Sequence, residues 1–179
     1  IIMMFGSVIV RVPAEDWKPK GFDPAKAMAK KLVTKAHVLV DNAVKTPQFY
    51  LLFGVLMLNV TAGIGVLGQA SVMIQELFSV ESVGASKAVD ASAAAGFVML
   101  LSLFNMAGRF IWSSLSDIIG RKNTYTIFFS LGIILYSSIP SIGASGSVVM
   151  FVATFAIIIS MYGGGFATVP AYLRDLFGT

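Results

Sequence analysis

Long runs without charged residues dominate the chain, and they are long enough to cross a lipid bilayer. A bilayer core about 30 Å thick requires roughly 20 residues of helix. Runs of at least that length, with no charge or with one, occupy residues 46–75, 91–116 and 123–173. The shorter apolar stretch within residues 1–12 is expected to be the end of one more helix. This pattern predicts a polytopic membrane protein.

The last run is about twice as long as one span, and it carries turn residues near its middle. Pro140 and Gly143 lie in the sequence SIPSIGASG, which favours a turn. A turn here predicts spans near residues 124–140 and 147–172. Lipid offers the backbone no hydrogen-bond partners, so each span must be a helix or part of a closed barrel, and the alternating pattern of barrel strands is missing. The expected fold class is therefore all-α.

Composition excludes several classes of chemistry. The chain is 56% hydrophobic and only 12% charged, against about a quarter charged in soluble domains. The absence of Cys excludes disulfides, thiol catalysis and Cys-ligated metals, and the single histidine, His37, excludes a site with two His ligands. Enzyme chemistry needs paired titratable groups, and the predicted spans contain none. We expect no metal, no cofactor and no enzymatic activity.

The basic residues follow a topological pattern. Lys and Arg in short loops are retained on the cytoplasmic side of a membrane. All 13 basic residues except Lys87 and Arg109 lie in or beside the segment 13–46, or in the later connections on the same side. Residues 13–46 are therefore expected to be a cytoplasmic loop of a multi-pass protein in the plasma (inner) membrane. Because topology explains the net charge of +4, it does not indicate nucleic-acid binding.

The loop 13–46 is expected to contain an amphipathic helix. Asp23 before Pro24 fits a helix start. Apolar side chains then recur at intervals of three and four residues, at Met28, Leu32, Ala36, Leu39 and Ala43. Such a basic helix lies against anionic lipid headgroups, packs across the bundle, or is a solvated linker that obeys the positive-inside rule.

Arg109 is the residue that most clearly breaks the rules of a membrane span. An Arg at a helix centre costs about 2.5–3.5 kcal/mol on insertion scales, so it needs a reason to be there. A guanidinium can bind a carboxylate or phosphate with two parallel hydrogen bonds, and Asn105 lies one turn away on the same face. The alternatives are that Arg109 reaches the membrane surface or pairs with an acid outside this sequence. The pattern favours an anionic substrate.

Three further features of the spans have two interpretations each. Gln69 and Tyr162 are candidate substrate-binding residues, although polar residues in spans more often tie helices together, as Asn59 would. The run Gly163, Gly164 and Gly165 is either a flexible point in a moving helix or a place of close helix contact, and the second is more common.

A charged motif joins the Arg109 span to the next one. The sequence SSLSDIIGRKN places Ser113, Asp117, Gly120, Arg121 and Lys122 in a tight connection between two helices. It resembles the loop signature G-x3-D-x2-G-R-[KR] of the major facilitator superfamily. Ser113 stands where that signature has Gly, a change that a small residue at a helix contact can tolerate.

The resemblance extends along the chain. The elements WKPKGF, TPQFYLLF, NMAGRF and YGGGFATVPAYLRDLFGT, in this order, resemble the oxalate/formate antiporter family of that superfamily. This resemblance implies a fragment of a twelve-helix protein, partnered by the missing helices. Residues 1–12 would end helix 6, residues 13–46 would be the central loop, and residues 47–179 would form helices 7–10 of an incomplete C-terminal bundle.

The resemblance also implies roles for individual residues. Arg109 matches an Arg of helix 8 that faces the central cavity and, with a Lys of helix 11, holds a dicarboxylate. Asp117 and Arg121 would pair at a helix end and stabilise one access state. The expected function is secondary transport of small mono- or dicarboxylates by alternating access. The alternatives are a carrier of the same fold for a sugar, drug or siderophore, a membrane sensor that binds without transport, and a membrane enzyme.

Overall fold

The structure is a computed structural model, and it describes Trp17, Thr34 and residues 37–178. The chain forms two units, Ile1–Lys31 and Leu32–Thr179, and all the helices described here belong to the second. The expected helix end at residues 1–12 and most of the expected amphipathic helix lie outside the described residues. Of the latter, the structure describes a single turn, α3 (Val40–Ala43).

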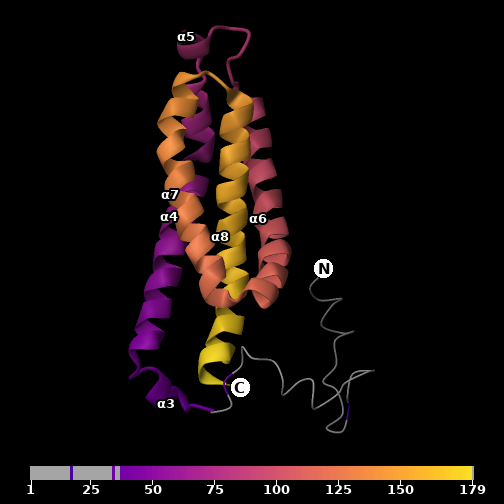
Figure 1. The fold of residues 1–179 in the computed structure, drawn as a ribbon. Helices are drawn as coiled ribbons and strands as arrows, with labels where there is room; N and C mark the ends of the chain where they lie inside the picture. The colour runs from indigo at the N-terminus through magenta and orange to yellow at the C-terminus, as the bar shows by residue number, and fades with distance from the viewer. Residues whose placement is uncertain (1–16, 18–33, 35–36, 179) are drawn as a thin grey trace. The chain divides into compact units, whose positions relative to one another are not determined.

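Four long helices make up the described bundle (Figure 1). Each is long and apolar enough to cross a membrane. They are α4 (Pro47–Leu77), α6 (Ala91–Ile119), α7 (Arg121–Ala144) and α8 (Val148–Phe177), and α5 (Val80–Val83) is one turn between the first two. The four predicted spans and the all-α fold class are confirmed, because the described part of the chain contains these helices and no strand.

Local signals in the sequence set the helix starts. Pro47 occupies the first turn of α4, where a missing N–H costs no hydrogen bond. Asp90 caps α6 by accepting a hydrogen bond from the backbone N–H of Ala93 at 2.7 Å. Ser147 caps α8 in the same way through the N–H of Met150.

The turn predicted within SIPSIGASG lies at the end of that stretch, so the first of the two spans extends beyond the predicted residue 140. Helix α7 continues through Pro140 and Gly143 and ends at Ala144. A proline one turn from a helix end removes a single hydrogen bond, and helices in membranes tolerate this loss. The chain turns instead at Gly146, whose φ of +65° is easily reached only without a side chain.

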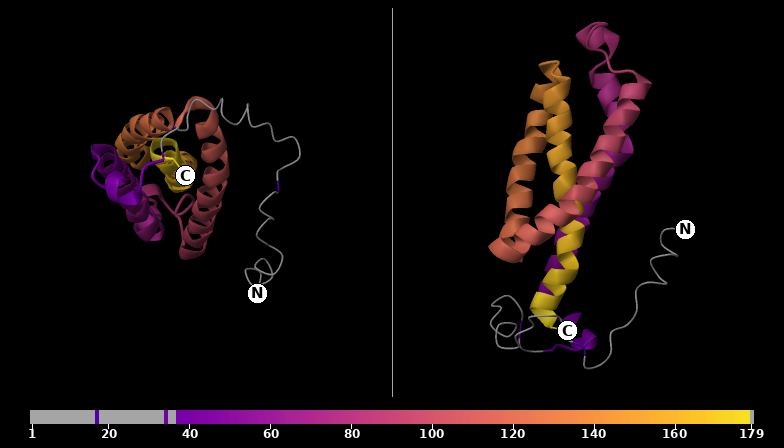
Figure 2. Two further views of the ribbon diagram at one scale, coloured as in Figure 1. Left: turned by 90° about the horizontal axis from the view of Figure 1, so that it is seen from below. Right: turned by 90° about the vertical axis from the view of Figure 1, so that its right-hand side faces the viewer.

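Helix α8 is the central element of the bundle. Seen along the helices, α8 lies among α4, α6 and α7 (Figure 2). In an apolar 18-residue stretch of α8, 56% of the residues are buried. In the corresponding stretches of the other three helices, between 17% and 22% are buried. Aromatic side chains pack around its first turns, where Phe151 and Phe155 contact Phe97 of α6 and Phe151 also contacts Phe78. Helices α6 and α7 contact α8 more than any other helix, whereas α4 packs against both α6 and α8.

Candidate functional site

Arg109 lies in the middle part of α6 and is exposed in the described bundle. It has no hydrogen bond or ion pair with any residue that the structure describes. Its neighbours Met106 and Phe110 are also exposed, at 53% and 71%. The four-helix bundle therefore leaves a cation without a counter-charge on an otherwise apolar helix surface.

Asn105 lies at the contact between α6 and α8. Its Oδ1 atom is buried and has no hydrogen-bond donor among the described residues. A Cβ atom placed on Gly163 would overlap the backbone oxygen of Asn105 and would also touch this Oδ1. The structure thus shows Asn105 packed against α8, with no hydrogen bond to the guanidinium of Arg109.

Tyr162 and Gln69 occupy different surroundings. Tyr162 is half-buried, and its ring packs where Gly63 of α4 has no side chain. Its backbone oxygen accepts a hydrogen bond of 3.4 Å from the side chain of Asn59. Tyr162 also lines a mostly apolar cavity of about 470 Å³ between α4, α7 and α8. Gln69 is exposed on α4.

The four candidate substrate-binding residues are therefore not gathered around one cavity of the described bundle. Arg109, Asn105 and Gln69 do not line the cavity that contains Tyr162. The three consecutive glycines beside Tyr162 are all buried and all face a neighbouring helix. These contacts favour the interpretation of close helix packing over that of a flexible point.

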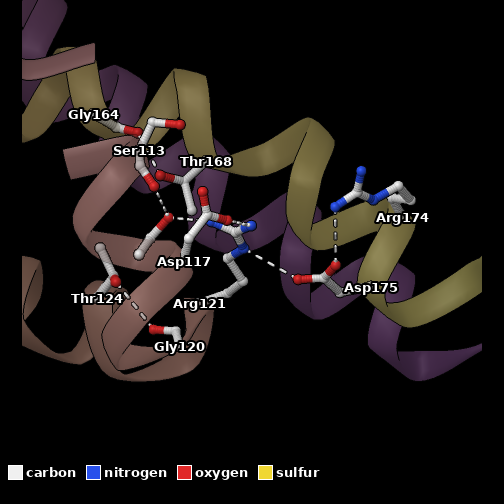
Figure 3. Close-up of polar contacts among 10 residues, drawn as sticks. Ser113, Asp117, Gly120, Arg121, Thr124, Gly164, Thr168, Arg174 and Asp175 are labelled. Atoms are coloured by element: carbon white, nitrogen blue, oxygen red, sulfur yellow. Dashed lines mark hydrogen bonds and ion pairs between the residues drawn. The ribbon is translucent and has the colours of Figure 1, made fainter. Parts of the chain in front are cut away.

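The charged motif after α6 forms a compact polar cluster (Figure 3). Arg121 begins α7, and its side chain is only 5% exposed. Its Nε donates a hydrogen bond to Oδ2 of Asp175 at 3.1 Å, Nη1 donates to Oγ of Ser116, and Nη2 donates to Oδ1 of Asp117. Arg174 lies beside the cluster, with Nη2 3.7 Å from Oδ1 of Asp175. We call Ser116, Asp117, Arg121, Arg174 and Asp175 the Arg121 cluster.

The turn between α6 and α7 explains how Arg121 reaches its partners. The two helices are separated by Gly120 alone, whose φ of +90° favours glycine. A cation in the first turn of a helix is repelled by the helix dipole, so Arg121 needs negative partners. Asp117 comes from the last turns of α6 and Asp175 from the last turn of α8. The guanidinium thus ties together the ends of three helices.

The two carboxylates of the cluster differ in burial. The side chain of Asp117 is 63% exposed, whereas that of Asp175 is 6% exposed. A buried carboxylate without a cation would be strongly destabilising. Oδ1 of Asp175 has no hydrogen bond and is reached only at ion-pair distance by Arg174, so Arg121 is the main partner of this acid.

The structure pairs Asp117 with Arg121, as the motif led us to expect, and it adds two residues that sequence reasoning missed. Ser113 contributes through its backbone oxygen, which accepts a hydrogen bond of 2.7 Å from Ser116, and Lys122 is exposed. Ser116 and Asp175 were not predicted. One signal was available for Asp175: an acid in the last turn of a helix is unfavourable beside the negative end of the helix dipole, unless a cation accompanies it.

Comparison with known proteins gives one family match along the whole chain and two relatives that match parts of it. A family model described as Major Facilitator Superfamily matches residues 1–179. An oxalate:formate antiporter of Oxalobacter formigenes is 37% identical over 82 residues, which are 46% of this chain and 19% of that protein. An uncharacterized MFS-type transporter YhjX of Escherichia coli (strain K12) is 25% identical over 147 residues, which are 82% of this chain and 34% of that protein. The aligned regions thus span no more than about a third of these relatives, and no solved structure matches significantly.

Proposed function

Because the chain belongs to the Major Facilitator Superfamily, we propose that the protein is a secondary active transporter of small organic anions, such as mono- or dicarboxylates. The observation that carries this proposal is Arg109, a cation with no partner in the described bundle on a helix suited to span a membrane. Burial of an unpaired charge in a membrane is costly. An anionic substrate would remove that cost while it is bound.

The chemistry of Arg109 favours a carboxylate. A guanidinium presents two parallel N–H donors that match the two oxygens of a carboxylate. One of the relatives bears the name oxalate:formate antiporter, and that name describes exchange of two carboxylates. The similarity covers 46% of this chain, and it supports the class of substrate rather than one compound. Because the described bundle does not gather Asn105, Gln69 and Tyr162 around Arg109, the proposal rests on Arg109 alone.

The mechanism that we propose is alternating access. In transporters of this kind, two helical bundles rock around a site at the interface between them. The site at Arg109 would face the other bundle, which the described helices do not include. In this arrangement residues 13–46 lie in the cytoplasm, and the protein crosses the plasma membrane several times. The remaining helices of the carrier and the surrounding lipid are its structural partners.

The Arg121 cluster is proposed to stabilise one of the two access states. It joins the ends of α6, α7 and α8 through three charge-assisted hydrogen bonds. Helices joined in this way can separate only if those bonds break. Ser113, Gly120 and Lys122 shape the same connection, so the whole motif acts on the rate of interconversion rather than on substrate affinity.

The experiment that tests the proposed function is anion exchange by the full-length protein in lipid vesicles. Oxalate, formate, a sugar and a cationic drug are compared as substrates. Wild type should exchange the carboxylates, and Arg109→Gln should reduce kcat/KM by about 10- to 150-fold, because hydrogen bonds to charged groups contribute about 1.5–3 kcal/mol. Lys87→Gln, which removes a cation from an exposed loop, is the matched control. Unchanged exchange by Arg109→Gln, or a preference for the sugar or drug, would reject the proposal.

A further inference from the structure

The part of α6 around Arg109 packs directly against α8, with the backbones of the two helices in contact. A Cβ atom on Gly108 would overlap the backbone oxygen of Ser160. A Cβ atom on Gly163 would overlap the backbone oxygen of Asn105. Side chains cannot fit at either position, so α6 and α8 approach as closely as two helices can.

A side-chain contact one turn further along α6 strengthens this crossing. Gly164 packs against the Cβ and ring of Trp112, and both Gly163 and Gly164 are buried. The indole Nε1 of Trp112 donates a hydrogen bond of 3.2 Å to Oγ of Ser160. That hydroxyl donates in turn to the backbone oxygen of Ile157 at 2.7 Å. We use the name α6–α8 clasp for Gly108, Trp112 and the backbone of Asn105 on α6, with Ser160, Gly163 and Gly164 on α8.

The three α6 residues of the clasp lie on both sides of Arg109 in the sequence. Asn105 is four residues before it, Gly108 one before it and Trp112 three after it. These three positions lie on one face of a helix, because an α-helix turns about 100° per residue. Arg109 is about 100° from Gly108 around the helix but only about 40° from Asn105 and about 60° from Trp112, so it projects from the edge of the contact with α8. Rotation or sliding of α6 would drive backbone atoms of the two helices into each other. This contact holds the backbone from which the Arg109 side chain extends.

We propose that the α6–α8 clasp is the positioning element of the anion site, and that Gly108, Trp112, Ser160 and Gly163 are positioning residues that act through Arg109. This inference rests on the proposed function, in which Arg109 binds the anion. Bidentate recognition of a carboxylate tolerates displacements of only about 0.5 Å and 10–20°. A helix that could rotate would present the two N–H donors at variable angles, so the rigid contact contributes to affinity.

The test compares three glycine variants of the full-length carrier, with oxalate exchange in vesicles as the measured activity. Gly108→Ala adds a methyl group at the clasp. Gly96→Ala adds one on the same helix, where nothing lies within 4 Å. Gly165→Ala adds a methyl group in the same glycine run of α8, at a position that faces α4 rather than α6. There it would overlap the side chain of Asn59. Gly165→Ala thus controls for any packing defect in that run.

The clasp predicts that only Gly108→Ala raises the KM for oxalate, by about tenfold or more, since displacements near 1 Å can cost on the order of 100-fold. Gly96→Ala should match wild type. Gly165→Ala should lower the yield of folded protein and leave KM unchanged. If Gly165→Ala raises KM as much as Gly108→Ala, or if Gly108→Ala leaves KM unchanged, the clasp is ordinary helix packing and the inference is wrong.

A second set of variants keeps the test decisive if Gly108→Ala does not fold. Trp112→Phe and Ser160→Ala remove the hydrogen bond between the two helices and retain most of the packing. Each should raise KM by about 2- to 10-fold, in line with the loss of one hydrogen bond. Wild-type KM in both variants would overturn the inference.

A measurement without transport separates this inference from the proposed function. Arg109→Cys is introduced into a cysteine-free version of the carrier, and its rate of reaction with a charged thiol reagent is recorded. Adding Trp112→Phe should change that rate at least twofold, whereas adding Gly96→Ala should not. An unchanged rate with Trp112→Phe contradicts the clasp. Normal oxalate exchange by Arg109→Gln contradicts the proposed function, whatever the reaction rate shows.

Discussion

Two arginines of this chain, twelve residues apart in the sequence, have opposite surroundings. Arg121 is 5% exposed, and each of its three terminal nitrogen groups donates to an oxygen of the protein. Arg109 is exposed and has no partner among the described residues. A buried guanidinium with two carboxylate partners already has its charge neutralised, whereas an unpaired one in a membrane span needs a counter-charge. The difference indicates where an anion would bind and where it would not.

The comparison also separates two ways in which a charge contributes to a membrane protein. Arg121 joins helix ends and should contribute to folding stability and to the choice of access state. Arg109 costs stability in the empty bundle and should contribute only when an anion is present. Variants at the two sites should therefore change different measurable quantities, and the following predictions test that separation.

The largest effect on stability is expected from Arg121→Gln. This change leaves Asp175 buried without its main cation, and breaking a buried ion pair in this way costs about 3–5 kcal/mol. The free energy of unfolding of the full-length protein can be measured by titration with SDS in detergent micelles. A loss below about 1 kcal/mol, the range of exposed ion pairs, would show that the cluster is not a buried unit.

A second change should restore part of that loss. Asp175→Asn removes the charge that Arg121→Gln leaves unpaired, so the double variant should be more stable than Arg121→Gln by about 1–3 kcal/mol, the usual size of coupling between contacting residues. The same SDS titration gives the coupling free energy from the two single variants and the double variant. Additive effects would mean that these residues do not interact as the structure shows.

Asp117→Ala should have a smaller effect on stability, although it removes another partner of Arg121. Its side chain is 63% exposed, and exposed ion pairs contribute about 0–1 kcal/mol. We expect the rate of oxalate exchange to change and the Kd for oxalate to stay the same. A higher Kd with an unchanged maximal rate would instead place Asp117 in the anion site.

Arg109→Gln should lower stability least of these variants. Because Arg109 makes no contact with a described residue that folding requires, the free energy of unfolding without substrate should not fall by more than about 0.5 kcal/mol. The measurement is again SDS titration, now with and without oxalate. A loss as large as that of Arg121→Gln would show that Arg109 has a structural partner in the full-length protein.

The sequence alone predicts those parts of the fold that depend on local patterns. The four spans follow from the distribution of charged residues, and the Asp117–Arg121 pair was expected from the resemblance of the loop to a known family signature. Helix α7 runs past its predicted end near residue 140 because a single proline close to a helix end removes only one hydrogen bond. A turn also needs a residue that accepts positive φ, which Gly146 provides.

Contacts between distant segments were beyond sequence reasoning. Arg121 and Asp175 are 54 residues apart, and they meet only because α8 ends beside the turn between α6 and α7. The importance of Gly108 is equally non-local, since it depends on the position of the Ser160 backbone in another helix. Hydrophobicity identifies Arg109 as unusual, but the packing of α6 on α8 determines the direction in which it projects.

The most direct test of the central claim is the affinity of the full-length carrier for oxalate, measured by isothermal titration calorimetry with wild type, Arg109→Gln and Arg121→Gln. Loss of charge-assisted hydrogen bonds predicts that Arg109→Gln raises Kd by about 10- to 150-fold. Arg121→Gln, once its folding is verified, should bind within about threefold of wild type. Equal affinity of Arg109→Gln and wild type would contradict the account, because the unpaired cation would then have no part in holding the anion.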